Sequence, residues 1–261
     1  MRSDLTQEEV VHYRDDGFVV LEDFLDPKEL DDWRSAFDEA VLLRGKDKVP
    51  GGEEDWPESP IFKQIMQLWM DNQPMKTLLH DERLGKMAAD LAGVDGVRIW
   101  HDQALIKMPW ANPTSWHQDN PKWSFTSDVA ISIWIALDDV TGHNGCMYFL
   151  PGSQKGRYKE VPVKAPMSEI FTLNPELAEI TPVPVPMQAG SCSFHNGLTV
   201  HGAGANMTPG FRRAMTCAFM PDGSTFNGIR NVLPESYFNS LRIGDVLNNS
   251  EQNPLIFKKS H

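Results

Sequence analysis

Two residues in the segment SWHQDNPKW could bind a metal ion together: His117 and Asp119 are separated by a single residue and follow a predicted strand. In extended backbone, side chains two positions apart point to the same side, so both can reach one ion. A further histidine, His201, lies in FHNGLTVHGAGAN, where the glycines after it leave room for a bound group. Two histidines and a carboxylate suit non-haem iron(II), because three protein ligands on one face leave three positions for a bidentate cosubstrate and dioxygen.

The pairing of a histidine with a carboxylate is weak evidence when it stands alone. His80 and Glu82 repeat the spacing on a predicted helix, where chance explains it. Catalytic zinc can also use two histidines and a carboxylate, so the ligand types leave the metal open. The pair gains weight from Arg212, which follows His201 at the start of a predicted strand. Arginine can bind a carboxylate through two parallel hydrogen bonds, although an isolated arginine is more commonly a solvated surface residue.

The strand RRAMTCAFM predicts which of two adjacent arginines faces the site. Successive side chains of a strand point to opposite faces. Arg212 is in phase with small residues that leave space beside a bound molecule, whereas Arg213 is in phase with larger ones that should pack outward under the N-terminal helices. The small set is Ala214, Thr216 and Ala218, and the larger set is Met215, Cys217 and Phe219. We therefore expect Arg212, and not Arg213, to bind a ligand carboxylate.

The elements that must position these residues begin with helices. A capping box in TQEE starts a short helix that Gly17 should end, and the run FVVLEDFL then predicts a strand. A second, amphipathic helix is expected from Asp26 to Gly45. The polar stretch 46–60 is expected to be a surface loop, and a third helix should cover about 75–91.

Beyond Gly93 the sequence predicts strands separated by turn residues. Helices first and strands afterwards, with no repeated βαβ unit, favour a mainly β fold with flanking α: a sandwich or jelly roll wrapped by the N-terminal helices. The Pro-rich stretch 160–186 is expected to be an insertion over one rim of this core. The expected strands span 97–108, 129–137, 146–150, 191–195 and 213–220.

The length of the chain predicts one catalytic domain over residues 1–261. Its parts would be a helical N-terminal region of about 1–95, a β core of about 96–225 and a C-terminal extension over 226–261. The sequence does not decide between a monomer and a homodimer.

Composition limits the partners and the compartment. The formal charge of -12 should repel phosphate backbones and anionic lipids, so neither nucleic acid nor a membrane is an expected partner. Three widely spaced cysteines predict buried thiols in a reducing compartment instead of a disulfide framework. The N-terminal segment is charged where a signal peptide needs an apolar stretch, and no apolar run is long enough to span a bilayer. These features predict a cytoplasmic protein.

Three segments together resemble the phytanoyl-CoA dioxygenase family of iron(II)- and 2-oxoglutarate-dependent oxygenases. They are HQD, DVAISIWIALDDVTGHNGCMYFLPGSQKG and FHNGLTVHGAGANMTPGFRRA. The resemblance implies a double-stranded β-helix core of cupin-like type, with iron held by His117, Asp119 and His201. It also implies that Arg212 binds the 5-carboxylate of 2-oxoglutarate. The carboxylate Asp119 argues against a halogenase, because related halogenases have a small residue at that position.

The resemblance extends less firmly to other positions of the cosubstrate site. Trp134 matches a residue that the family places against 2-oxoglutarate, although an inward tryptophan also serves packing, and Ser132 shares its strand face. The neighbouring strand DQALIKMP presents either Asp102 or Gln103 to the site, and Gln103 is the candidate contact. Lys63 is a loose match to a lysine that some members use. The family often has a serine where this chain has Ala203, so Arg212 should carry more of the cosubstrate binding.

The predicted reaction is hydroxylation of a small molecule by dioxygen, with conversion of 2-oxoglutarate to succinate and carbon dioxide; ascorbate is the expected reductant in vitro. A cupin-like zinc or manganese hydrolase or isomerase that does not use 2-oxoglutarate is the alternative, and a binding protein with a decayed site is a third. Arg212 favours the oxygenase, because the alternatives need no carboxylate anchor at that spacing. Loop residues beside the metal site suggest an aromatic and amide-rich substrate pocket: Trp110, Trp116, Asn120, Trp123, His143 and Asn144.

Overall fold

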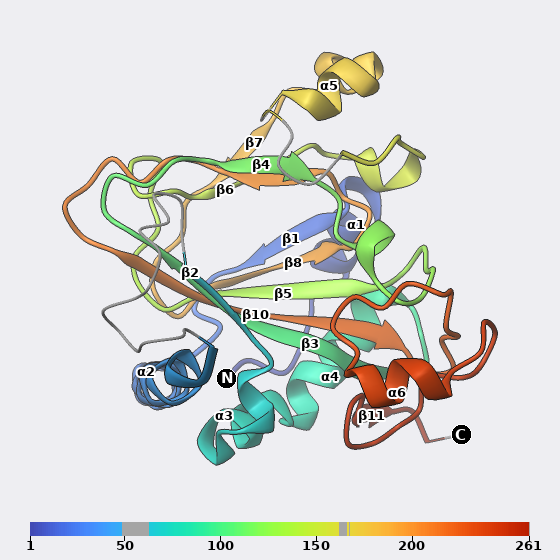
Figure 1. Cartoon of the computed structure of the whole chain (residues 1–261). Helices are drawn as coiled ribbons and strands as arrows, with labels where there is room; N and C mark the ends of the chain where they lie inside the picture. The colour runs from blue at the N-terminus through green and yellow to red at the C-terminus, as the bar shows by residue number, and fades with distance from the viewer. Residues whose placement is uncertain (49–62, 162–165, 167, 261) are drawn as a thin grey trace.

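Two antiparallel β-sheets face each other and enclose the candidate site (Figure 1). The computed structural model describes residues 1–48, 63–161, 166 and 168–260. The major sheet has the order β1 (Phe18–Leu21), β8 (Cys192–Asn196), β5 (Ile131–Ala136), β10 (Arg212–Pro221), β3 (Gly96–Lys107) and β11 (Leu255–Lys258), and β2 (Lys63–Met66) also pairs with β3. The minor sheet has the order β4 (Thr114–His117), β9 (His201–Ala203), β6 (Met147–Phe149) and β7 (Val183–Val185). This arrangement is the jelly-roll core that the sequence predicts.

Alternation along the central strands gives the major sheet two different faces. In β5, Ile131, Ile133 and Ile135 pack on the helix-covered side, whereas Ser132 and Trp134 face the minor sheet. Strand β10 shows the predicted phase, with its larger set in the core under the helices and Arg212 and Thr216 on the inner side. The period-two pattern of a strand therefore separates core residues from site residues.

The first two helices begin where the sequence predicts. In α1 (Gln7–Asp16), Thr6 and Glu9 form the capping box, and Gly17 ends the helix with a φ of 83°. The second helix, α2 (Pro27–Lys48), continues through Gly45, which we expected to end it. A glycine within a helix costs only about 1 kcal/mol relative to alanine, so it does not have to stop one.

The predicted third helix is wrong as a single element. The structure has α3 (Gln73–Leu79) and α4 (Glu82–Ala92), separated at His80 and Asp81. The Asp81 carboxylate accepts a hydrogen bond from the backbone N–H of Arg83 at 2.9 Å and so caps a new helix. The apolar spacing continues across the break, which is why periodicity alone does not reveal it.

The N-terminal helices cover the outer face of the major sheet (Figure 1). Side chains such as Trp33, Phe37, Met75 and Leu84 form one buried cluster with the outward residues of the sheet. Cys146, Cys192 and Cys217 are free and buried, as their spacing predicts. Within the described part of the chain, no helix is long and apolar enough to cross a membrane.

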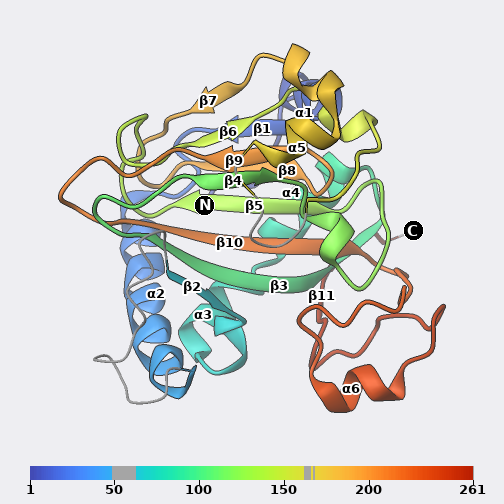
Figure 2. The ribbon, with the colours of Figure 1, turned by 45° about the horizontal axis from the view of Figure 1, so that its top comes forward.

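Two segments extend beyond the core (Figure 2). The predicted insertion contains α5 (Glu169–Leu173) and β7, and Ile170 and Leu177 pack it against Leu150 and Val200 next to the minor sheet. The C-terminal segment contains α6 (Glu235–Ser240) and β11 and packs at the end of the sheets near Trp100. Residues 46–48 of the predicted loop 46–60 belong to α2 instead, and the rest of that stretch lies outside the described residues. Short 3-10 helices are η2 (Leu68–Met70), η3 (Asn120–Lys122), η4 (Ser153–Lys155) and η5 (Pro175–Glu179).

Candidate metal centre

His117, Asp119 and His201 come together at one wall of a cavity between the sheets. His117 ends β4 and stands directly opposite His201 at the start of β9. The Asp119 Oδ1 atom is 3.5 Å from His117 Nε2 and 3.9 Å from His201 Nε2. One ligand atom from each residue lies within 4.8 Å of the others, which is close enough for all three to bind one ion.

Backbone carbonyls orient both histidine rings. His117 Nδ1 is 2.7 Å from the carbonyl oxygen of Ser115, and His201 Nδ1 is 2.9 Å from that of Thr199. A carbonyl oxygen can only accept, so each Nδ1 carries the proton and donates it. In the neutral form of each ring, Nε2 is then left with its lone pair, and this is the form in which imidazole binds a metal.

Asp119 reaches the site by a different backbone path from the one we expected. It does not continue an extended strand: its φ of -84° and ψ of -51° are helical, and it precedes η3. Its backbone N–H donates to the carbonyl of Gly197 at 3.0 Å, which ties this turn to the loop between β8 and β9. The prediction that His117 and Asp119 share one ion agrees with the geometry, but a turn anchored by a distant loop brings them together.

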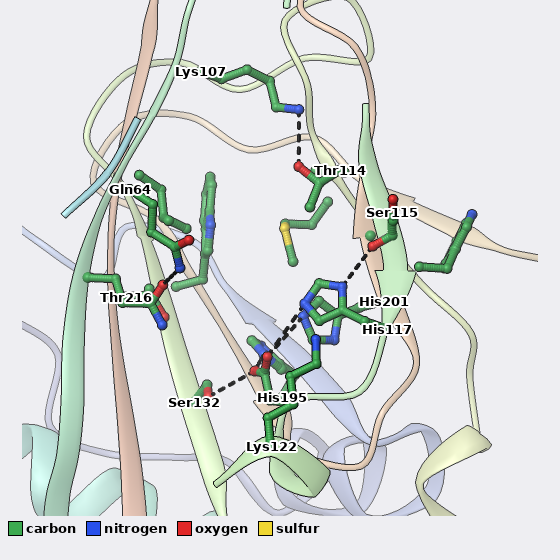
Figure 3. Close-up of a pocket in the computed structure, with 18 of the residues that line it drawn as sticks. Gln64, Lys107, Thr114, Ser115, His117, Lys122, Ser132, His195, His201 and Thr216 are labelled. Atoms are coloured by element: carbon green, nitrogen blue, oxygen red, sulfur yellow. Dashed lines mark hydrogen bonds and ion pairs between the residues drawn. The ribbon is translucent and has the colours of Figure 1, made fainter. Parts of the chain in front are cut away.

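Two further side chains contact the Asp119 carboxylate. His195 Nε2 lies 3.4 Å from Oδ2, and Ser132 Oγ donates to the same oxygen at 3.5 Å. Figure 3 shows Ser132 and His195 near the His117 and His201 rings, at the end of the cavity away from Lys107. Both contacts fall on Oδ2, so Oδ1 is the oxygen left facing the two histidine ligands.

Burial and the neighbouring charges set the protonation of the ligands. Burial, reinforced by His117, lowers the pKa of His201 well below its usual range, so this imidazole is neutral at neutral pH. Burial opposes ionisation of Asp119, but the positive charge that the surrounding imidazoles gain when they are protonated at low pH, His201 above all, holds the pKa of this carboxyl well below its usual range. The site therefore offers a carboxylate at Asp119 and a neutral imidazole at His201.

Arg212 lies in the wall of the same cavity, on the major sheet. It is only 3% exposed, it donates to the carbonyl of Gly145 at 2.9 Å, and its guanidinium carbon lies 5.0 Å from the centre of the Trp134 ring. Burial lowers its pKa to about 10, so it remains charged at neutral pH. The Nε atom of Arg212 and the Nε1 atom of Trp134 are buried donors with no acceptor among the described residues.

The inner face of β3 is the one that carries Gln103. Gln103 pairs with Thr216 of β10 and lines the cavity, whereas Asp102 pairs with Cys217 and is buried in the opposite direction. The candidates Trp134, Ser132 and Gln103 thus all lie in the cavity wall.

The backbone of Lys63 lies in β2 opposite Ile106 of β3, and its side chain lies outside the described part of the structure. Gln64 and Met66 of the same strand line the cavity. A contact between Lys63 and the cosubstrate stays a prediction.

The predicted substrate loops reach the cavity only in part. Trp116 and Trp123 line it, whereas Trp110 is 68% exposed to solvent. Asn120 is buried, with its side-chain oxygen accepting from the N–H of Ser127. The remaining two, His143 and Asn144, belong to a turn before β6 and are not part of the lining.

Sequence reasoning missed several residues of the cavity wall, among them His195, Lys107 and Asn231. His195 had a detectable signal, since it lies on a predicted strand shortly before His201. Lys107 was in the candidate strand but on a face that the sequence left undecided. Asn231 comes from the C-terminal segment, and nothing local in the sequence connects that segment to the site.

The residues present fit an iron(II) centre. Two imidazole Nε2 atoms and a single carboxylate oxygen are the donor set that non-haem iron(II) oxygenases use, and no thiolate lies among them. The cavity beside the three ligands has room for a cosubstrate. The buried donors in its wall, Arg212 Nε and Trp134 Nε1, require acceptors such as carboxylate oxygens. When bound, the iron would supply the activation of dioxygen, while the chain would orient the reactants and exclude water.

Comparisons with known proteins identify the family. The family model for phytanoyl-CoA dioxygenase (PhyH) matches residues 13–214 of this chain. The peroxisomal phytanoyl-CoA dioxygenase of Mus musculus is 25% identical over 237 residues, covering 82% of this chain and 68% of its own. A probable alpha-ketoglutarate-dependent hypophosphite dioxygenase of Stutzerimonas stutzeri is 24% identical over 221 residues, covering 79% of this chain and 76% of its own.

Solved structures agree with this assignment. The non-heme alpha-ketoglutarate-dependent carbocyclase SnoK from nogalamycin biosynthesis has a TM-score of 0.80 and 27% identity, covering 97% of this chain and 96% of its own. The epimerase SnoN, in complex with Fe³⁺, alpha-ketoglutarate and nogalamycin RO, has a TM-score of 0.78 and 26% identity, with 96% and 98% covered. These comparisons favour the oxygenase over the hydrolase and the decayed site. The chain belongs to the phytanoyl-CoA dioxygenase family and is an oxygenase that depends on iron and 2-oxoglutarate.

Proposed function

We propose that this oxygenase hydroxylates a small molecule inside the cavity between its two sheets, with His117, Asp119 and His201 as the iron ligands. The observation that carries the proposal is the placement of the three ligands and of the buried Arg212 in the walls of one cavity. The ligands come from the minor sheet and the turn after it, and Arg212 comes from the major sheet. A cosubstrate that binds iron at one end and carries a carboxylate at the other would bridge the two sheets.

Arg212 and Trp134 support 2-oxoglutarate as that bridging molecule. Arg212 Nε and Trp134 Nε1 are buried next to the cavity and lack an acceptor in the described structure. A buried donor left without an acceptor costs about 1–3 kcal/mol, so a ligand that supplies acceptors here is strongly favoured. We propose that Arg212 binds the 5-carboxylate and that Trp134, Ser132 and Gln103 form the wall against which the cosubstrate lies.

The size of the cavity favours a small substrate. Its volume is about 520 Å³, within the range of roughly 300–1,000 Å³ that is usual for small-molecule sites. Part of this space must hold the cosubstrate. The substrate therefore has to be small, or it has to place only its reacting part between Trp116 and Trp123 while the remainder lies outside.

The outcome of the reaction is open to a direct test, because relatives with the same cofactors differ in what they make. SnoK is a carbocyclase and SnoN an epimerase, and both resemble this chain over nearly its whole length. Hydroxylation adds one oxygen atom to the substrate, ring closure removes two hydrogen atoms, and epimerisation leaves the mass unchanged. Mass spectrometry of products from a metabolite panel would distinguish the three, and a product without added oxygen would contradict the hydroxylase proposal.

The proposal can also be tested before a substrate is known. Anaerobic addition of iron(II) and 2-oxoglutarate should produce a weak visible charge-transfer band. Under air with ascorbate, the protein should form succinate slowly alone and faster with the correct substrate, with uptake of dioxygen. Absence of both the band and succinate formation across a broad substrate panel would contradict the proposal.

We further propose that residues 1–261 act as one domain, as a monomer or homodimer in the cytoplasm. Burial of the N-terminal helices and of the C-terminal segment against the same sheet supports a single unit, and three free thiols suit a reducing compartment. Relatives with peroxisomal names make the compartment worth testing. Light scattering of the purified protein and microscopy of a fluorescent fusion would decide the two questions.

A further inference from the structure

Lys107 is a second buried cation beside Arg212 on the inner face of the major sheet. The two residues are paired across β3 and β10, and both line the cavity. Lys107 is 2% exposed and Arg212 is 3% exposed. Lysine is almost never buried to this extent unless its ammonium group interacts with something that stabilises the charge.

Both cations converge on the loop at Gly145. Arg212 donates to the carbonyl oxygen of Gly145 at 2.9 Å. The Lys107 chain passes so close to the same residue that a Cβ there would be 2.4 Å from Lys107 Cδ, and Gly145 has a φ of +93°. A glycine is required here, because any side chain would displace the lysine from its path.

The ammonium group of Lys107 crosses from the major sheet to the minor sheet. Its Nζ donates to the carbonyl of Asn112 at 3.1 Å and to Thr114 Oγ1 at 3.3 Å. Thr114 is the cross-strand partner of Ala203, which contributes only a methyl group to the cavity. Figure 3 shows Lys107 and Thr114 together at the end of the cavity away from the His117 and His201 rings.

Two like charges in a buried position oppose each other. Burial, together with the charge of Arg212, lowers the pKa of Lys107 to about 7. The acidic group whose charge acts on Arg212 is Asp138, and Asp138 is already bound by Arg213 on the outer face. An anion held between the two cations would relieve their repulsion and would favour the charged form of Lys107.

We infer that Lys107 is a second cationic anchor for the distal carboxylate of 2-oxoglutarate, on the side of the cavity opposite Trp134. Lys107 would then select dicarboxylates over 2-oxo acids that are shorter or that lack a distal carboxylate. The inference rests on the proposed role of Arg212 in binding that carboxylate. Ala203 has no side-chain donor for the cosubstrate, and we infer that Lys107 donates a hydrogen bond to the distal carboxylate in its place.

The test measures how tightly two cosubstrates of equal chain length bind to the Lys107→Met and Arg212→Ala variants. 2-Oxopentanoate keeps the 2-oxo acid that binds iron but has a methyl group in place of the 5-carboxylate. We expect Lys107→Met to weaken the binding of 2-oxoglutarate about ten- to a hundredfold, as loss of a charged hydrogen bond predicts, and to leave 2-oxopentanoate unchanged. Anaerobic calorimetry with the iron(II) protein measures both affinities, and Lys155→Met, far from the cavity, controls for loss of one positive charge.

Structural damage would give a different pattern, because it would weaken both cosubstrates alike; that result, or an unchanged 2-oxoglutarate affinity, overturns the inference. If Lys107→Met does not fold, Lys107→Gln keeps a donor toward Asn112 and Thr114 without the charge and should lose the same discrimination. An unchanged 2-oxoglutarate affinity with an altered Michaelis constant for the organic substrate would mean that Lys107 binds an anionic group of the substrate instead, and would also overturn the inference.

The Arg212→Ala variant, measured in parallel, separates this inference from the proposed function. Unchanged 2-oxoglutarate binding by Arg212→Ala would contradict the proposed function, whereas a binding defect confined to Arg212→Ala would contradict only the role of Lys107.

Discussion

Arg212 and Arg213 are adjacent in β10 and lie on opposite faces of the major sheet. Arg212 is buried in the cavity wall, whereas Arg213 pairs with Asp138 and with Asp38 of α2, each at 2.8 Å. The side chains of consecutive strand residues must diverge in this way. The two arginines therefore form a matched pair of sites with the same chemistry and different surroundings.

Substitution of each arginine should have a separate effect. Arg212→Ala should raise the apparent Michaelis constant for 2-oxoglutarate about ten- to a hundredfold, because a charged, bidentate hydrogen bond is lost. Arg213→Ala should change that constant little and instead lower the free energy of unfolding by about 1–3 kcal/mol, mainly through loss of the partly buried ion pair with Asp138, since the pair with Asp38 is exposed. Steady-state kinetics and urea denaturation of both variants measure the two effects, and a cosubstrate defect confined to Arg213→Ala would contradict the assignment.

Substitution of a metal-binding histidine should remove iron and activity, whereas substitution of another histidine should not. Purified protein should bind one iron(II) per chain, and His117→Ala or His201→Ala should abolish both iron retention and succinate formation, because two protein ligands hold iron(II) poorly. His12→Ala, on the exposed side of α1, is the matched control and should retain both. Iron content after dialysis and succinate assays give the readouts, and full activity of a metal-stripped His201→Ala variant would contradict the ligand assignment.

A serine at position 203 should strengthen cosubstrate binding. Ala203 lines the same cavity as Arg212 and Lys107 and is 8% exposed, so a hydroxyl group there would face that cavity. One additional hydrogen bond of about 0.5–1.5 kcal/mol corresponds to a two- to tenfold tighter binding of 2-oxoglutarate by Ala203→Ser. The affinity for 2-oxopentanoate should not change. Calorimetry measures both, and weaker 2-oxoglutarate binding would mean that the position does not adjoin the distal carboxylate.

Asp102 should make the stability of the protein depend on pH. Burial raises the pKa of Asp102 to about 7, although the backbone N–H of Leu68 donates to its carboxylate at 2.9 Å. A folded-state pKa above the unfolded value means that ionisation favours unfolding. The free energy of unfolding should therefore fall as the pH rises from about 4 through 7, with a slope of at most roughly 1.4 kcal/mol per pH unit.

Asp102→Asn should remove this component and flatten the dependence, because asparagine cannot ionise. Urea denaturation of both proteins at a series of pH values measures the two slopes. Equal slopes in wild type and variant would show that Asp102 does not titrate in this range.

Local patterns in the sequence were sufficient for much of the fold and the site. The capping box at Thr6 and the strand phase of Arg212 each depend on residues close together in the chain. Backbone geometry converts such spacing directly into direction, so these features follow without knowledge of the remaining structure. The break between α3 and α4 was missed because the cap at Asp81 interrupts the backbone without interrupting the apolar pattern.

Contacts between distant segments decided the rest. Alternation divides β3 into two sets of side chains but does not state which set faces inward, and only the pairing of Gln103 with Thr216 settles that choice. The same pairing places Lys107 opposite Arg212, and the end-packing of the C-terminal segment brings Asn231 to the cavity wall. The sequence therefore determined the ligand types and the alternation of each strand, whereas the tertiary structure decided which faces enclose the cavity, because hydrogen bonds between strands far apart in the chain fix that register.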